Sequence, residues 1–199
     1  MKIKILLLIA LIIAVVSGCA TRPPVDISHR NASWDIHRDQ ISKLTNWRAS
    51  GRISVRLDNQ AWSATLQWRQ QRQDYFLRLI APLGQGTYEI TGNQAGVLLR
   101  TAKNKIYKAK DPETLMQSNF GWSVPLTGLI YWIRGLPEPG IHTELLSLDD
   151  QGRIMDLAQS GWRVNCSAYN ETGGYDLPGR IALQNDKLKV RLVIKNWKL

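Results

Sequence analysis

Short runs in which apolar and polar side chains alternate recur along most of this chain. The clearest run lies near the end, where the apolar residues Leu188, Val190, Leu192 and Ile194 alternate with the basic residues Lys187, Lys189, Arg191 and Lys195, except at Val193. A repeat of two is the period of a β-strand that has one buried face and one solvated face. The pattern therefore predicts an antiparallel sheet with a single apolar face.

The same alternation predicts further strands, separated by polar turns such as Asp58-Asn59-Gln60. They cover residues 51–57, 62–69, 75–79, 88–90, 97–100, 105–109, 162–169 and 180–184, and strands return from about Thr143. In total we expect about eleven strands. The chain has no internal repeat and no low-complexity segment.

Three segments have helical signals instead. Ser33 is a candidate cap for a helix through about Asn46, and Asp111 with Pro112 predicts a short helix toward Phe120. Another helix is expected over 123–135, with Pro125 in its first turn and an apolar stripe at helical spacing. The stripe consists of Leu126, Leu129, Ile130 and Ile133.

Together these elements predict a mainly β (α+β) domain built on a curled sheet. Strands twist, so a sheet of this size acquires a concave face, and the helices are available to cover it. A concave apolar face is either filled by side chains or left partly open as a pocket, and the sequence does not separate the two. The positions expected to line such a pocket are Ile53, Val55, Trp62, Leu66, Trp68, Leu77, Leu79, Leu126, Leu129, Ile130, Ile133, Val190 and Leu192.

The first residues have the features of a secretory signal. Lys2 and Lys4 precede an apolar run from Ile5 to Val16, which is shorter than the roughly 20 residues that span a bilayer. The run ends in Val16-Ser17-Gly18-Cys19, which resembles the lipobox of bacterial lipoproteins. We expect a signal peptide over 1–18, a lipidated Cys19 with a flexible tether over 19–32, and one domain over 33–199.

The lipobox resemblance also implies where the protein lies. Cys19 would carry a diacylglyceryl group and an amide-linked acyl chain such as palmitate, which together give a stable anchor. Ala20, where aspartate would signal retention in the inner membrane, implies the outer membrane, with the domain facing the periplasm. Export removes nucleic acid as a partner. Loss of Lys2 and Lys4 with the signal lowers the formal charge from +10 to +8, and this charge points to anionic lipid headgroups or an acidic protein face.

After lipidation Cys166 is the one remaining cysteine, so no internal disulfide is expected. We interpret it as a small buried side chain. The histidines His29, His37 and His142 form no cluster, and the chain has no phosphate loop, nucleophile elbow or metal-ligand spacing. We therefore expect no enzyme, no metal and no cofactor.

The segment from Ala81 to Gly86 joins two predicted strands. Pro82 and Gly84 favour a turn that leaves Leu83 at its tip. An exposed leucine is often incidental. On a membrane-tethered protein, however, it could insert among the lipid acyl chains, and burial of the side chain there would stabilise the contact by about 1.5–3 kcal/mol.

Several motifs, in this order and spacing, resemble the LolB family of outer-membrane lipoprotein receptors over nearly the whole mature chain. They are Trp47-Arg48-Ala49-Ser50-Gly51-Arg52-Ile53, Pro82-Leu83-Gly84, Val124-Pro125-Leu126, Trp132-Ile133-Arg134-Gly135-Leu136-Pro137, Gly174-Tyr175-Asp176 and Asn196-Trp197.

The resemblance implies an open, unclosed antiparallel β half-barrel of about eleven strands, with about three helices covering the concave apolar face. Such a receptor accepts acylated lipoproteins from a periplasmic LolA-like carrier and inserts them into the inner leaflet of the outer membrane. Leu83, with Pro82 and Gly84, falls on the family's membrane-delivery loop, and a monomer in contact with outer-membrane lipids is expected. The alternative is a tethered lipid sensor or scaffold that passes no cargo on.

Overall fold

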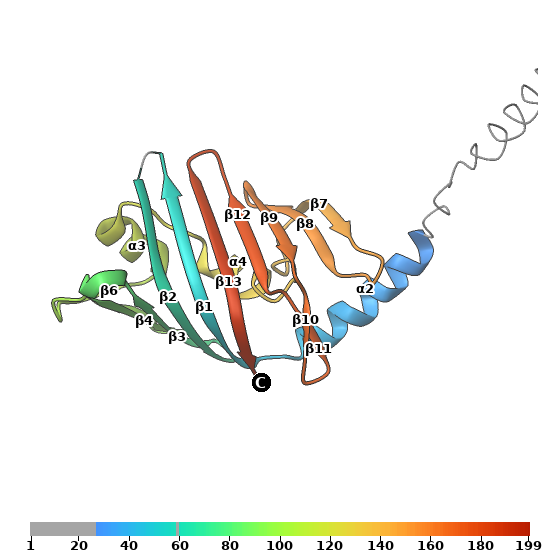
Figure 1. Cartoon of the computed structure of the whole chain (residues 1–199), viewed down its shortest axis with the longest axis horizontal. Helices are drawn as coiled ribbons and strands as arrows, with labels where there is room; N and C mark the ends of the chain where they lie inside the picture. Colours follow the sequence, from blue (N-terminus) through green and yellow to red (C-terminus); the bar gives the residue numbers. More distant parts are fainter. Residues whose placement is uncertain (1–26, 59) are drawn as a thin grey trace, which may run out of the picture.

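The computed structural model of the chain describes residues 27–58 and 60–199. The predicted signal peptide, Cys19 and the first part of the predicted tether lie outside these residues. Eleven strands form one antiparallel sheet in the order β6-β5-β4-β3-β2-β1-β13-β12-β9-β8-β7. Figure 1 shows a curled, open sheet with β6 at one edge and β7, beside helix α2, at the other.

The sheet is built almost entirely from neighbours in sequence, except that β13 pairs with β1 and β12 with β9. Its strands are β1 (Asn46–Leu57), β2 (Gln60–Gln71), β3 (Asp74–Ile80), β4 (Thr87–Asn93), β5 (Gly96–Arg100), β6 (Ile106–Ala109), β7 (Thr143–Leu148), β8 (Ile154–Gln159), β9 (Trp162–Ser167), β12 (Arg180–Gln184) and β13 (Leu188–Lys198). The antiparallel sheet predicted from the alternation is confirmed, and so is the open form that the family resemblance implied. A separate hairpin, β10 (Asn170–Thr172) with β11 (Tyr175–Leu177), is an element that the sequence analysis did not foresee.

Burial follows the alternation that predicted the strands. In β1, β2 and β13 nearly every second residue is buried and its neighbours are exposed. The strand β1 begins at Asn46, five residues before the predicted start at Gly51, because Trp47 and Ala49 continue the buried face. All the apolar faces gather on the concave side in one hydrophobic cluster.

Gly51 lies where the register between β1 and β13 shifts, between Ser50 and Gly51. A Cβ atom at this position would lie 1.9 Å from the carbonyl oxygen of Val193. The close approach of the two backbones at this bulge therefore requires glycine.

Within the described residues, three α-helices accompany the sheet: α2 (Ile27–Ser42), α3 (Pro112–Phe120) and α4 (Leu126–Trp132). The Asp111 cap of α3 is confirmed, since its side chain accepts a hydrogen bond from the Thr114 N–H at 2.8 Å. Helix α4 is shorter than the predicted 123–135, because Pro125 is its N-cap and the turns after Trp132 are irregular.

The start of α2 also differs from the prediction. The helix begins at Ile27 rather than at a Ser33 cap, so residues 27–32 are helical rather than extended. The prediction followed the apolar spacing that starts at Trp34, and that spacing marks where the helix is buried rather than where it begins. The buried side of α2 contacts the β7–β8 end of the sheet, since a Cβ at Gly152 would lie 2.4 Å from the Trp34 nitrogen.

Among residues 27–58 and 60–199, none of the helices combines the length and the hydropathy that a membrane span requires.

Candidate functional site

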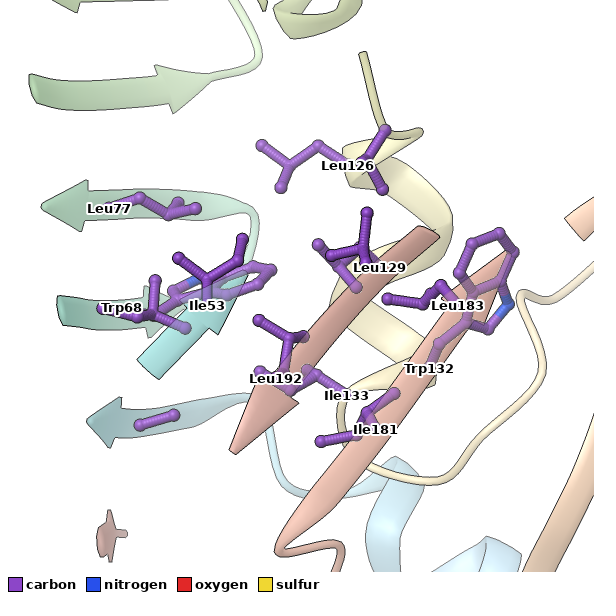
Figure 2. Close-up of a cluster of buried hydrophobic side chains, with 14 of the residues drawn as sticks. Ile53, Trp68, Leu77, Leu126, Leu129, Trp132, Ile133, Ile181, Leu183 and Leu192 are labelled. Carbon is purple, nitrogen blue, oxygen red and sulfur yellow. The ribbon is translucent and has the colours of Figure 1, made fainter. Parts of the chain in front are cut away.

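The concave face of the sheet and helix α4 enclose the apolar interior. Figure 2 shows Ile53 and Trp68 of the sheet facing the α4 side chains, with Leu192 on the neighbouring strand. The α4 stripe presents Leu126 and Leu129 to the same space. These groups come from segments far apart in sequence, and the curl of the sheet brings them together.

The structure gathers the predicted lining positions in and around one cluster. All of them are buried except Trp62 and Ile130, which are half-buried and pack against it. Ile133 and Val190 have no exposed surface, so other side chains cover them completely. The protein's own side chains therefore occupy the space between the sheet and α4.

The end of α4 is fixed by buried hydrogen bonds. The indole N–H of Trp132 donates to Oε1 of Gln159 on β8 at 3.1 Å. The guanidinium of Arg134 donates to the carbonyl oxygens of Ile41 at 3.2 Å and Leu44 at 2.8 Å. These bonds attach the helix end to β8, to the last turn of α2 and to the segment that follows it.

Arg134 is 5% exposed and its guanidinium lies 5.3 Å from the ring centre of Tyr131. Burial lowers the pKa of Arg134 to about 10, which still leaves it protonated at neutral pH. A buried cation of this kind is stabilised by the carbonyl oxygens it bonds and by the ring face.

The start of α4 has a different kind of attachment. Its first backbone N–H, at Leu126, donates to Oε1 of Glu113 on α3 at 2.7 Å. The two helices are thereby coupled, whereas the side-chain hydrogen bond from α4 to the sheet, Trp132 to Gln159, lies at the other end of α4.

Four half-buried rings lie where α3 meets the sheet, and we call them the aromatic cluster. Phe120 of α3 stacks on Trp122 at 5.5 Å between ring centres and meets Tyr88 of β4 edge-on at 5.3 Å. Trp62 of β2 lies 6.0 Å from Trp122. Pairs at these distances are attractive, so the cluster closes this end of the interior by contacts between rings.

Leu83 lies at the tip of a 3₁₀ turn, η1 (Pro82–Gly84), between β3 and β4. Its side chain is 96% exposed, the largest exposure among the exposed large apolar residues of the described chain. Its backbone has φ 53° and ψ 34°, in the left-handed region that a branched residue such as leucine seldom adopts. The turn thus holds an apolar side chain out in solvent.

Cys166 is buried on β9, and its thiol lies 3.7 Å from the Trp132 carbonyl oxygen. Burial raises the pKa of Cys166 to about 12, so the thiol stays neutral. The interpretation of Cys166 as a small buried side chain is confirmed. Within the described part of the chain, no group of three His, Cys, Asp or Glu side chains is placed to hold a metal ion.

Sequence reasoning missed two of these contacts. Arg134 stands out in the sequence only as part of a motif, although its position among Trp132, Ile133 and Leu136 is a signal that its side chain is buried. Nothing in the local sequence marked Gln159, which is fully buried and bonds Trp132 as well as the backbone N–H of Glu138.

Comparison with known proteins identifies relatives over nearly the whole chain. The family model described as "Outer membrane lipoprotein LolB" matches residues 45–197. The outer-membrane lipoprotein LolB of Pseudomonas savastanoi pv. phaseolicola is 39% identical over 189 residues, which cover 94% of this chain and 92% of that protein. The LolB protein of Stutzerimonas stutzeri is 40% identical, with 91% of this chain and 89% of that protein covered.

Solved structures share the fold at low sequence identity. A LolA superfamily protein from Nitrosomonas europaea aligns with a TM-score of 0.53 at 9% identity, covering 85% of this chain and 93% of that one. A DUF1329 family protein from Desulfovibrio piger also aligns with a TM-score of 0.53, at 8% identity, covering 84% and 92% of the two chains.

Proposed function

The chain belongs to the LolB family of outer-membrane lipoproteins, and from this premise we propose how its fold accepts and delivers cargo. It is a lipid-anchored outer-membrane lipoprotein receptor in lipoprotein localisation, and its partners are lipoprotein cargo and a LolA-like carrier. The proposal concerns the residues that hold the acyl chains, the route by which the chains enter and the loop that meets the membrane.

The acyl chains of the cargo bind between the concave face and helix α4. The side chains there are apolar, and burying each methylene of an acyl chain contributes about 0.8 kcal/mol. In the structure those side chains contact one another, so binding requires α4 to move away from the sheet and exchange internal contacts for contacts with lipid. No covalent bond changes in this reaction.

Entry takes place at the aromatic cluster. The C-terminal end of α4 is held by the Trp132 and Arg134 hydrogen bonds. Its N-terminal end is coupled to α3 through Glu113. Helix α3 packs on β5 and β6 with Leu115 and Met116 buried, and its last residue, Phe120, contributes a half-buried ring to the aromatic cluster. The two helices therefore open as a pair at that end, and half-buried rings offer an apolar path for an acyl chain.

Leu83 then contacts the membrane during delivery. Inserting one leucine side chain stabilises the encounter by about 1.5–3 kcal/mol, too little to anchor the protein but enough to favour a productive orientation. The anchor itself is Cys19, followed by a tether, and the receptor acts as a monomer next to outer-membrane lipids. Cargo moves onward because the bilayer is the largest apolar sink in the sequence of transfers.

The observation that carries the delivery step is the 96% exposure of Leu83 at the tip of η1. The test uses the mature chain with Cys19→Ala, mixed with a carrier that holds a labelled lipoprotein. We expect cargo to pass to the receptor in solution and then to liposomes. Leu83→Glu is expected to accept cargo normally and to lose most of its delivery to liposomes.

The matched control is Ile36→Glu on α2, which also converts an exposed apolar residue into a charged one. This variant is expected to deliver cargo like the parent. Equal delivery by the parent and Leu83→Glu would contradict the role of the loop. Cargo that stays on the carrier in every mixture would contradict acyl transfer and favour a static lipid sensor.

A further inference from the structure

The middle of the outer, convex face of the sheet is strongly basic. Strands β1, β2 and β13, which lie side by side, contain no aspartate or glutamate. Their outward positions include several arginines and lysines, so this face carries positive charge that its own strands do not compensate. The lipoprotein-binding interior lies on the opposite face and uses none of these side chains.

A groove of about 500 Å³ lies on this face, directly beside the Leu83 turn. Its lining includes Ala81 and Pro82, the two residues before Leu83. The register of the sheet places Val193, Arg52, Thr65 and Ile80 in one row across β13, β1, β2 and β3. The groove therefore continues from the membrane-delivery turn across four strands.

The chemistry of the groove is divided into apolar and cationic parts. Ile80 is 37% exposed and Val193 42% exposed, so each end of the row presents an uncovered apolar side chain. Between them lie Arg52 and, from the next row, Arg191 opposite Ser54. Among the described residues neither arginine forms an ion pair, so both guanidinium groups are available to a ligand.

The floor between the arginines consists of small hydroxyl side chains, Ser54, Ser63 and Thr65. Small residues leave room for a ligand of moderate size, and hydroxyl groups donate hydrogen bonds to oxygen anions. Two guanidinium groups near hydroxyl donors and flanked by apolar surface match a phosphate diester that carries alkyl chains.

We propose that this groove binds the headgroup phosphate of an anionic membrane phospholipid while the adjacent Leu83 turn is inserted in the leaflet. The proposal rests on the proposed delivery role of that turn and assigns the lipid class that it meets. Binding there fixes the tilt of the receptor on the membrane, because a charged contact and an apolar contact are made side by side.

The test measures binding of the mature Cys19→Ala chain to vesicles of phosphatidylethanolamine with phosphatidylglycerol, at physiological salt. The variant Arg52→Gln with Arg191→Gln is expected to bind about tenfold more weakly or worse, because a basic residue near an anionic surface contributes a factor of about five. Vesicles of phosphatidylcholine alone are expected to bind the parent and the variant equally weakly. Millimolar inorganic phosphate is expected to leave vesicle binding nearly unchanged, because it lacks the alkyl chains.

The matched control is Arg48→Gln with Lys198→Gln, which removes the same charge from the same two strands. Arg48 is four residues from Arg52, about 13 Å along β1, which exceeds the Debye length of about 8 Å. This control is expected to lose less than about threefold in affinity. Equal losses of vesicle affinity for the two double variants would contradict a specific lipid site in the groove, because they would indicate diffuse attraction by the whole basic face.

Two further outcomes separate this inference from the delivery proposal. The double variant Arg52→Gln with Arg191→Gln is the groove variant. If it binds vesicles normally while Leu83→Glu still blocks delivery, the proposed phospholipid site in the groove is wrong and the delivery role of the Leu83 turn stands. If the groove variant binds vesicles normally but receives cargo from the carrier more slowly in solution, the groove binds an acidic protein face instead. Normal delivery of cargo by Leu83→Glu would contradict the delivery role of the Leu83 turn, whatever the vesicle binding of the groove variant.

Discussion

The carboxylate of Glu113 on α3 accepts the backbone N–H of Leu126, the first residue of α4, at 2.7 Å. A short charged hydrogen bond thus holds together the two helices that lie over the apolar interior. The start of a helix has unpaired N–H groups and a partial positive charge, and a carboxylate satisfies both.

Glu113→Ala is expected to lower the free energy of unfolding by about 1.5–3 kcal/mol, the usual contribution of a hydrogen bond to a charged group. It should also speed the uptake of a fluorescent fatty acid, since the start of α4 becomes free to leave the sheet. Urea denaturation and stopped-flow fluorescence measure the two effects. Glu144→Ala, at an exposed position on β7, serves as the control and should change stability by less than about 0.5 kcal/mol. Identical uptake rates would show that α4 is not the moving part.

Gly51→Ala is expected to destabilise the protein by about 1–3 kcal/mol, because the added methyl group meets the Val193 carbonyl oxygen and forces the bulge open. The loss is measured by thermal or urea denaturation. Ser54→Ala, on the same strand with its side chain in solvent, should be nearly neutral. A neutral Gly51→Ala would mean that the bulge relaxes without cost.

His37 on α2 predicts a dependence of stability on pH. Its ring is buried between Trp34 and Tyr169, 6.4 Å from each ring centre. Burial lowers the pKa of His37 below 6.5, and Asp176 opposes the shift only in part. The unfolded chain therefore takes up a proton more readily than the folded one, and stability is lost as the pH falls through 6.5.

The measurement is the free energy of unfolding at pH 7.5 and at pH 5.5. The parent should lose stability at the lower pH, and His37→Leu, which has no proton to gain, should lose less. His142→Gln, at an exposed position, should behave like the parent. A pH dependence that is unchanged in His37→Leu would assign the effect to other groups.

The sequence predicted the sheet better than it predicted the helices, and the reason is physical. In β13 the period of two is enforced by one solvated face and one buried face, so burial can be read from residue type. The extent of α2 before Trp34 has no such signal, because its first turns are not marked by an apolar stripe. The cap at Asp111 was predicted because the capping bond is local.

The candidate site shows the same division. The turn at Leu83 followed from Pro82 and Gly84, which act on adjacent residues. The bonds of Arg134 and of Gln159 join segments far apart in sequence, and such partners are decided only when the chain is folded. Whether the interior is open or filled depends on summed side-chain volumes, which alternation does not report.

Photo-crosslinking tests the central claim most directly, that the apolar interior accepts the acyl chains of cargo. A lipoprotein carrying a photoreactive acyl chain is transferred from its carrier to the mature Cys19→Ala receptor. The complex is then irradiated, and the labelled residues of the receptor are identified by mass spectrometry. We predict labels on the α4 stripe around Leu129 and on inward positions of β1 and β2 such as Ile53 and Leu66. Labels confined to the outer face of the sheet, or to the Leu83 turn alone, would contradict the account.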